Sequence, residues 1–396
     1  MKKNLLFVMP SLKAGGGEKS LVNLLLQLDY TRYNVDLYLF QPDGLFLEAL
    51  PKEVNLLRTS RSYKAFSQGL GKSVVHFLGR GEVKLAYSRL LFTVKNRVIR
   101  NRSASEQYTW KYQSRSIEPL SKEYDAAIGY LEKSSIYYVV DKVRAHKKIG
   151  WIHTNYSNSG MDPLFDGPYF KKLDHVVTVS DECAESLRTH FLEVHNKIKI
   201  IRNIVSPPTI WRLSDKEPLD QEILEKGGMK LVTVARLSPE KGIDLAVKAC
   251  SHLVSKGYPV QWYVLGEGGE RGNLEKLIRE HGLEDTFHLL GNRENPYPFI
   301  KSADLYVQPS RYEGRSIAID EAKILRKAIV VTNYETAKDQ IKDGVNGLLA
   351  DRSEEGLAAT IETLLRDPEL RNRLITGLSR ESLGTEEEVH KLYELC

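Results

Sequence analysis

The sequence predicts an α/β fold of two doubly wound parallel-sheet domains facing a cleft. Short apolar, β-rich segments alternate with helical patterns along the chain, which is typical of sheets built from βαβ units. The 396 residues are too many for one compact core of the usual size and suit two domains. A composition of 41% hydrophobic and 28% charged residues is that of an ordinary globular protein and excludes a disordered, collagen-like or low-complexity chain.

The strand candidates fall into two series. Those of the first half are Asn4–Met9, Val35–Phe40, Val54–Leu57, Ala126–Tyr130, Lys148–His153, His175–Ser180 and Lys197–Arg202. Those of the second half are Lys230–Arg236, Val260–Gly266, Phe287–Leu290, Leu305–Gln308, Ala328–Thr332 and Gly347–Ala350. Helical patterns lie between them, for example Glu18–Leu28, Asp181–His190, Lys241–Ser255, Asn273–His281 and Ser316–Arg326.

The predicted domain boundary lies in a polar, proline-marked segment from Pro207 to Asp215, which we interpret as the linker. The first domain is predicted to be residues 1–206, with a basic helical insertion at about 58–122, and the second to be residues 207–378. The segment from Asp367 to Cys396 has the pattern of two short helices with no strand to follow.

The strongest motif runs from Ser310 to Ala322, after one apolar strand and into a helix. Its acids Glu313 and Glu321 would lie about 12 Å apart if the interval were helical, which is about the span from sugar to ribose in a nucleotide diphosphate sugar. Gly314 allows close approach to a ligand, and free N–H groups near Ser316 would bind an anion at the helix start. The alternative is helix capping and a solvated face.

A second motif, Val234 to Gly242, also follows a strand. Ser238 is predicted to cap the helix that Pro239 begins, with Arg236 and Lys241 on either side of the turn. Two cations aimed at one diphosphate could stabilise a departing nucleoside diphosphate without a metal. The alternative is two surface cations at an ordinary helix start.

Two weaker candidates lie in the first domain. A glycine loop that includes Gly16 and Gly17 joins the first strand to the first helix, and Glu18 stands where an ATP-binding loop needs glycine. Such a loop can still cradle phosphate or let a sugar approach. His153 ends the strand that contains Trp151, where a donor sugar would lie in the cleft.

Several chemistries are not predicted. The sequence has no Asp-x-Asp and no His, Cys and carboxylate cluster with metal-ligand spacing, so we predict no metal and no resident cofactor. It has no Gly-x-Ser-x-Gly, which disfavours an α/β hydrolase. Three scattered cysteines disfavour a disulfide scaffold and suit a reducing cytosol. No apolar stretch approaches the roughly 18 residues of a membrane span, so we expect a cytoplasmic protein.

Charge is concentrated in one segment. Between Arg58 and Lys122 there are 14 Lys and Arg against three acids, although the whole chain carries only +5. Residues 84–100 are predicted to form a helix with a basic face (Arg89, Arg97, Arg100) and an apolar face (Leu91, Phe92, Val94, Val98, Ile99). Such a helix can lie on an anionic bilayer, and general nucleic-acid binding is not predicted. The alternative is a helical hairpin packed on the first domain.

The chain resembles the retaining glycosyltransferases of family 4, whose GT-B fold has two Rossmann-like domains. The resemblance spans nearly the whole chain and is strongest in four motifs of the second half: Glu313 with Glu321, Arg236 to Gly242, Gly291 with Asn295-Pro296-Tyr297, and Asp304 to Ser310. It implies that the second domain binds the nucleotide sugar, that the first takes the acceptor side, and that residues 379–396 form a helix crossing back to the first domain. Arg326-Lys327-Ala328 departs from the Gly or Asn, Lys and Pro that the family usually has.

The resemblance also implies roles for the candidate residues. Arg236 and Lys241 would hold the donor diphosphate, Glu321 would bind the ribose, and Glu313 would face the donor sugar. The remaining implied contacts are backbone N–H groups of Ser316 and Ile317 to phosphate, Arg293 beside the base, Gly16, Gly17 and Gly314 lining the donor pocket, and His153 near the sugar. Asn203 occupies the place of the family's asparagine beside the interdomain crossing.

The implied activity is metal-independent transfer of a hexose, with retention, from a nucleotide diphosphate sugar. The expected donor is a UDP-sugar, and the expected acceptor is a saccharide or lipid-linked saccharide in cell-surface polysaccharide or capsule biosynthesis. The segment from Arg58 to Lys122 would then place the enzyme peripherally on the inner face of the plasma membrane. Two alternatives stay open: a non-catalytic GT-B subunit that binds a sugar nucleotide, and a GT-B sugar-nucleotide epimerase.

Overall fold

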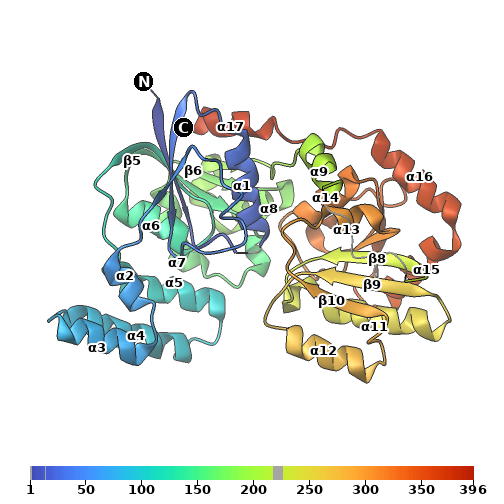
Figure 1. The fold of residues 1–396 in the computed structure, drawn as a ribbon. Helices are drawn as coiled ribbons and strands as arrows, with labels where there is room; N and C mark the ends of the chain where they lie inside the picture. The colour runs from blue at the N-terminus through green and yellow to red at the C-terminus, as the bar shows by residue number, and fades with distance from the viewer. Residues whose placement is uncertain (1, 14, 217–225) are drawn as a thin grey trace. The chain divides into compact units, whose positions relative to one another are not determined.

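The computed structural model describes residues 2–13, 15–216 and 226–396. These residues form two compact units (Figure 1), one containing Gly17–Arg202 and Glu388–Cys396 and the other containing Asn203–Glu387. Each unit is a parallel sheet with helices, so the predicted α/β class with two Rossmann-like domains is confirmed. The cleft between the domains stays a prediction.

The first unit is built on a seven-stranded sheet in the order β3-β2-β1-β4-β5-β6-β7. Every pairing is parallel. The strands are β1 (Lys3–Met9), β2 (Tyr33–Leu39), β3 (Val54–Leu57), β4 (Glu123–Gly129), β5 (Arg144–Ile152), β6 (His175–Thr178) and β7 (Ile198–Ile200). Each overlaps one of the predicted strands of the first half.

The helices of the first unit follow the strands as the alternating pattern predicts. They are α1 (Gly16–Gln27), α2 (Arg61–Phe66), α3 (Leu70–Gly79), α4 (Val83–Val98), α5 (Arg102–Gln113), α6 (Ser134–Lys142), α7 (Pro163–Lys171) and α8 (Asp181–His190). The last helix of the chain, α17 (Glu388–Leu395), belongs to this unit as well.

The second unit is built on a six-stranded parallel sheet in the order β10-β9-β8-β11-β12-β13. Its strands are β8 (Met229–Val234), β9 (Val260–Leu265), β10 (Phe287–Gly291), β11 (Leu305–Gln308), β12 (Ala328–Thr332) and β13 (Leu348–Ala350). Neighbouring residues of β8 point to opposite faces of the sheet and belong to different hydrophobic clusters. Leu231 lies in one hydrophobic cluster and Val232 in the other, so the strand is buried on both faces.

The helices of this unit are α9 (Pro207–Ser214), α11 (Ile243–Ser255), α12 (Arg271–Glu280), α13 (Tyr297–Ser302), α14 (Ile317–Ile324), α15 (Glu354–Arg366) and α16 (Pro368–Ser379). The predicted linker from Pro207 to Asp215 is wrong, because these residues form α9. Two prolines at the start of a helix are tolerated, since the first turn needs no N–H donors there. Ile210 of α9 is buried in the same cluster as Val232.

The chain passes between the units at Arg202/Asn203 and at Glu387/Glu388, against predicted boundaries after residues 206 and 378. Thr385 joins the two passages, because its hydroxyl accepts from the backbone N–H of Val205 at 2.8 Å and donates to the carbonyl of Asn203 at 2.8 Å. In α17, Tyr393 stacks on Tyr33 with ring centroids 5.1 Å apart. The C-terminal helix thus packs in the first unit, against the start of β2.

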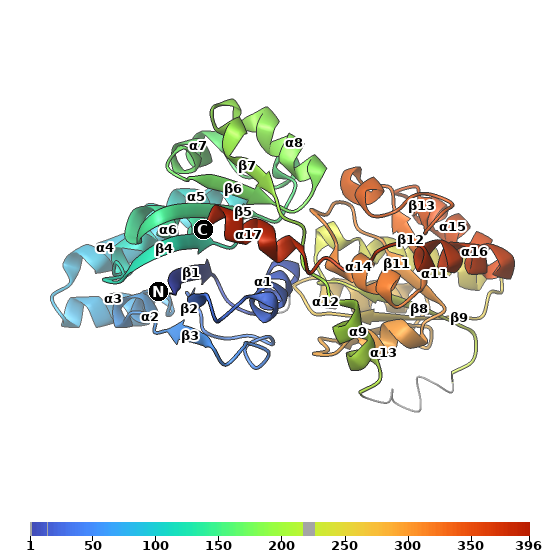
Figure 2. The same cartoon turned by 90° about the horizontal axis from the view of Figure 1, so that it is seen from above.

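The helices α3 and α4 form a hairpin that extends beyond α2 and α5 (Figure 2). The predicted assignment of its faces is wrong at two residues. Phe92, expected on the membrane-facing side, packs on Phe66 and Phe77 in a small core of the hairpin. Arg89, expected on the basic face, lies over the Phe66 and Phe92 rings and donates to the carbonyl of Gln68. A two-helix projection needs a core of its own, and these side chains supply it.

A helix can cross a bilayer only if about 20 of its consecutive residues are predominantly apolar. Among the residues that the structure describes, no helix is both long and apolar enough to cross a membrane.

Candidate functional site

The strand order of the second unit reverses between β8 and β11, and ligands of doubly wound sheets bind at the carboxyl ends of the strands at such a point. The motif from Arg236 to Gly242 follows β8, and the motif from Ser310 to Glu321 follows β11. The two motifs that the sequence singled out therefore lie on the two loops next to the reversal.

Gly242 allows these two loops to touch. It has φ +64°, and a Cβ atom there would lie 2.0 Å from the carbonyl oxygen of Pro309. The guanidinium of Arg311 adds a second link, since it pairs with both carboxylate oxygens of Asp244 at 2.6 and 2.8 Å and donates to the carbonyl of Pro239. The loop that contains Lys241 is thus held close to the end of β11.

Lys241 and Glu313 are brought together by this contact. The ammonium of Lys241 lies 2.5 Å and 2.7 Å from the two carboxylate oxygens of Glu313. The side chain of Glu313 is only 9% exposed and that of Lys241 only 23% exposed. The family resemblance implies that Lys241 holds a diphosphate, and in the structure this residue is the counter-ion of a nearly buried carboxylate.

Glu313 is held by more than its counter-ion. Its Oε1 accepts from Ser310 Oγ at 2.8 Å and from Gln308 Nε2 at 3.2 Å. The buried hydroxyl of Tyr306 donates to Gln308 Oε1 at 2.6 Å. Burial, with the charges of Glu321 and Glu313, raises the pKa of Tyr306 well above its usual range. Tyr306 therefore stays a neutral donor that orients the side-chain amide of Gln308, and this amide in turn orients the carboxylate of Glu313.

Glu321 lies on α14 and is 1% exposed. Its Oε1 accepts from the hydroxyl of Tyr297 at 2.9 Å. The carboxylate is buried because α14 is covered on most of its surface, with Ile317 and Ile319 in the hydrophobic cluster.

The helix start near Ser316 differs from the prediction. The backbone N–H of Ser316 donates to Gln340 Oε1 at 2.9 Å, and Gln340 Nε2 donates to the carbonyl of Ser316 at 2.8 Å. Ser316 therefore uses its N–H within the fold and does not offer it to phosphate. Ile317 begins α14, and Gly314 is buried in the loop before it. Gln340 lies 24 residues further along the chain, so no local pattern predicts the pairing.

The second motif is also arranged differently in detail. Residues Pro239–Lys241 form one 3-10 turn that Gly242 separates from α11, so Ser238 caps no continuous helix. The hydroxyl of Ser238 donates to Glu240 at 2.5 Å instead. Arg236 is exposed at the end of β8. Arg293 is exposed after β10, with its guanidinium 5.9 Å from the centre of the Phe299 ring.

The first unit has its own reversal of strand order between β1 and β4. Gly16 begins α1, is exposed, and has no described atom within 4 Å of an added Cβ. A Cβ at Gly17 would lie 2.9 Å from Leu131 Cδ1 and 3.9 Å from the ring of His153. The structure therefore places Gly17 beside His153.

His153 is held through its backbone. Its N–H donates to Glu132 Oε1 at 2.6 Å, and the N–H of Thr154 donates to the same oxygen at 2.9 Å. Burial lowers the pKa of His153 to about 3, so the imidazole is neutral near neutral pH. Its Nε2 is shielded from solvent and has no hydrogen-bond partner among the described residues. A neutral ring with an unused nitrogen suits hydrogen bonding to a sugar hydroxyl.

Sequence reasoning missed the supporting residues of both loops. Glu132 follows β4 by three residues, at the edge where ligands bind, and its burial raises its pKa. Gln308 ends β11 and Ser310 follows it, inside the Asp304–Ser310 motif of the family resemblance, so their position at the carboxyl end of a strand was the available signal. Tyr297 belongs to another motif of that resemblance, which implied no role for this residue.

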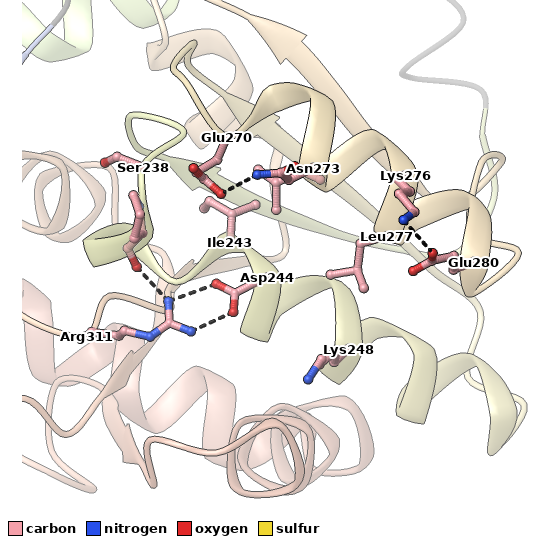
Figure 3. Close-up of a pocket in the computed structure, with 12 residues that line it drawn as sticks. Ser238, Ile243, Asp244, Lys248, Glu270, Asn273, Lys276, Leu277, Glu280 and Arg311 are labelled. Carbon is pink, nitrogen blue, oxygen red and sulfur yellow. Dashed lines mark hydrogen bonds and ion pairs between the residues drawn. The ribbon is translucent and has the colours of Figure 1, made fainter.

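Two further features lie in the second unit, and the first shares Ser238, Pro239 and Arg311 with the two loops described above. A cavity of about 440 Å³ lies between α11 and α12 (Figure 3) and is lined by both acids and bases, including Asp244, Glu270 and Lys276. One group of described side chains, His252, Glu354 and Glu355, could approach a metal ion. Glu354 is already paired with Lys248 at 2.9 Å, so we assign no metal to it.

Comparison with known proteins finds a similarity for most of the second unit. Residues 215–378 match the model of the family described as "Glycosyl transferases group 1". Alpha-D-kanosaminyltransferase of Streptomyces kanamyceticus is 32% identical over 169 residues, which are 41% of this chain and 44% of that protein. Glu313, Glu321, Arg236 and Lys241 all lie within the residues that are similar to this family.

A further relative and one solved structure extend the comparison. The N-acetylgalactosamine-N,N'-diacetylbacillosaminyl-diphospho-undecaprenol 4-alpha-N-acetylgalactosaminyltransferase of Campylobacter jejuni is 27% identical over 222 residues, 55% of this chain and 58% of that protein. The chain spans about half the length of the curated relatives that it matches. The structure of Anabaena Alr3699/HepE with UDP and glucose has a TM-score of 0.72 at 17% identity and covers 99% of this chain and 98% of that one. It shows that the GT-B type of fold extends over both units.

Proposed function

We propose that the protein is a retaining, metal-independent glycosyltransferase that moves a hexose from a nucleotide diphosphate sugar to a saccharide acceptor. The observation that carries this proposal is the Lys241–Glu313 pair at the strand-order reversal of the unit that matches the group 1 glycosyl transferases. A UDP-sugar is the proposed donor, because the structural neighbour of Anabaena was crystallised with UDP and glucose.

In the proposed reaction the acceptor hydroxyl oxygen bonds to the anomeric carbon on the face from which the diphosphate leaves. The bond between that carbon and the phosphate oxygen breaks, and its electron pair stays on the diphosphate. The acceptor proton passes to the departing phosphate oxygen. Arg236 and Lys241 would stabilise the charge that develops there, as preorganised donors do in other transfer reactions.

The other residues would bind the donor. Glu321 would accept hydrogen bonds from the ribose hydroxyls, Glu313 would face the donor sugar, and the neutral ring of His153 would bind a sugar hydroxyl. Ile317, at the start of α14, would offer its N–H to phosphate, while the same group of Ser316 is used by Gln340. The proposed acceptor is a saccharide on a lipid carrier, as in the name of the relative of Campylobacter jejuni, in cell-surface polysaccharide synthesis at the inner face of the plasma membrane.

A donor panel tests the proposal. A ligand at a hundred times its dissociation constant stabilises the folded state by about 2.7 kcal/mol, so thermal unfolding with UDP-, GDP- and ADP-sugars should identify the nucleotide. Release of UDP without added metal and in the presence of a chelator would support the transferase, and NMR of the product would report the anomeric configuration. Interconversion of two UDP-sugars would instead identify an epimerase. Binding with neither reaction would identify a non-catalytic subunit.

A further inference from the structure

One face of α4 carries exposed apolar side chains at helical spacing. We call this face the α4 stripe, and its members are Val83, Tyr87, Leu90, Val94 and Val98, with exposures of 61%, 59%, 43%, 55% and 69%. At about 100° per residue these five positions fall within an arc of about 80°. At a rise of about 1.5 Å per residue the stripe is about 22 Å long.

The α4 stripe takes no part in the core of the hairpin. The core side chain Phe92 lies on the opposite side of α4 and packs on Phe66 of α2 and Phe77 of α3. Helix α3 also has exposed apolar residues, Val75 at 70% and Leu78 at 53%. A contiguous apolar row on a projecting helix marks an interaction surface, because isolated exposed apolar residues are the norm elsewhere.

Exposed cations flank the α4 stripe on both sides. By helical position Lys84 and Lys95 lie on one flank and Arg97 on the other, and all three are exposed. From Leu70 to Arg100 the chain has seven Lys and Arg and a single acid, Glu82. An apolar stripe between cations is the pattern of a helix that lies in a bilayer interface.

We propose that the α3–α4 hairpin binds the surface of an anionic lipid bilayer. The α4 stripe enters the boundary between headgroups and acyl chains, and Lys84, Lys95 and Arg97 lie over lipid phosphates. Charge favours this occupant over a second copy of the chain, since two copies would bring two strongly basic hairpins together. Binding of the hairpin to a bilayer does not depend on the proposed glycosyl transfer, so an experiment can refute either proposal and leave the other standing.

Co-sedimentation of the full chain with vesicles tests the proposal. We expect binding to phosphatidylcholine vesicles that contain about 30% phosphatidylglycerol, weaker binding as salt is raised, and little binding to phosphatidylcholine alone. Replacing the two cations by K84Q/K95Q should weaken binding about 25-fold, at about fivefold per cation. Replacing two members of the stripe by L90S/V94S should weaken it by at least about tenfold.

Matched controls lie outside the hairpin. Leu192 is 78% exposed in the same unit, and the side chain of Lys276 is 73% exposed in the other unit. L192S and K276Q should bind vesicles as the original chain does. All four variants change exposed residues, and circular dichroism with donor-induced thermal shifts should match the original chain.

Three results would overturn the proposal. The first is absence of vesicle binding, or equal binding to neutral and anionic vesicles, by the unchanged chain. The second is vesicle binding by K84Q/K95Q and L90S/V94S as strong as that of the controls. The third is a dimer in light scattering that L90S/V94S converts to monomer, because the α4 stripe would then be covered by a second copy.

Discussion

Replacing Lys241 by methionine separates its contribution to the fold, as the counter-ion of Glu313, from its proposed role in the reaction. The substitution keeps the length and most of the volume of the side chain and removes the ammonium. Glu313 then loses the ammonium of Lys241, which lies 2.5 and 2.7 Å from its two oxygens. It keeps the hydrogen bonds from Ser310 Oγ at 2.8 Å and from Gln308 Nε2 at 3.2 Å. The carboxylate remains 9% exposed, so solvent replaces little of what is lost.

The remaining donors decide the size of the effect on stability. Removing one partner of a buried ion pair costs about 3–5 kcal/mol when the other charge is left alone. Because Ser310 and Gln308 still donate to Glu313, we expect K241M to lower the free energy of unfolding by only about 1–3 kcal/mol. If Lys241 also stabilises the departing diphosphate, kcat/KM should fall by about 10²- to 10³-fold.

Urea unfolding and UDP release measure the two effects separately. The double variant K241M/E313Q should recover part of the stability, since a neutral amide at 313 needs no counter-ion, and should recover none of the activity. K256M, which removes an exposed lysine of the same unit, is the matched control and should retain activity. The reasoning is refuted if K241M loses stability as expected and keeps kcat/KM within about threefold, because the lysine would then serve the fold alone.

Three more substitutions test particular contacts. Y297F removes the donor to the buried Glu321 and should cost about 1–2 kcal/mol in urea unfolding and raise KM for the donor, whereas an unchanged KM would separate Glu321 from the ribose. Below its ordinary pKa of 6.5 the imidazole of His153 is protonated in the unfolded chain. In the fold it stays neutral until the pH nears its lowered pKa of about 3. The unfolded chain therefore binds the extra proton, and the free energy of unfolding decreases as the pH falls below 6.5. H153Q should therefore lose about 2 kcal/mol less stability than the original chain between about pH 7 and pH 5, and equal losses would contradict the assigned burial. R326G should raise the unfolding free energy by about 1 kcal/mol, since Arg326 has φ +52°, and a loss of stability would show that its side chain matters more than this strain.

The strands could be predicted from the sequence because their signal is local. Each is a short apolar run between helical patterns, and burial on both faces of a parallel sheet makes such runs continuous, as in Leu5 to Met9. The same locality explains the error at Pro207. Two prolines suggest a linker, yet they also begin α9, and only the packing of Ile210 in the second unit decides between these readings.

The sequence predicts which loops carry the candidate site residues, and it does not predict the contacts that these residues make. A motif after a strand places Glu313 and Lys241 at the ligand-binding edge, but their pairing needs Gly242 to let two distant loops touch. The use of Ser316's N–H by Gln340 likewise depends on a residue 24 positions away. A contact between residues that lie 24 positions apart leaves no periodic pattern in the sequence. The position of Ser316 at a helix start therefore predicted that its N–H would be available to a phosphate.

The site suits transfer chemistry because its charges are oriented within the fold. Electrostatic stabilisation of a leaving group is strongest when the donors need no reorganisation during the reaction. Lys241 is fixed by Glu313, Glu313 by Ser310 and Gln308, and Gln308 by the hydroxyl of Tyr306. A lysine without this support would have to lose rotamer freedom in each turnover, at a cost of about 1.5–2 kcal/mol. The chain of contacts should therefore act on kcat more than on donor binding, so a variant that cuts it far from the ligand, such as Y306F, should lower kcat while donor KM stays nearly constant.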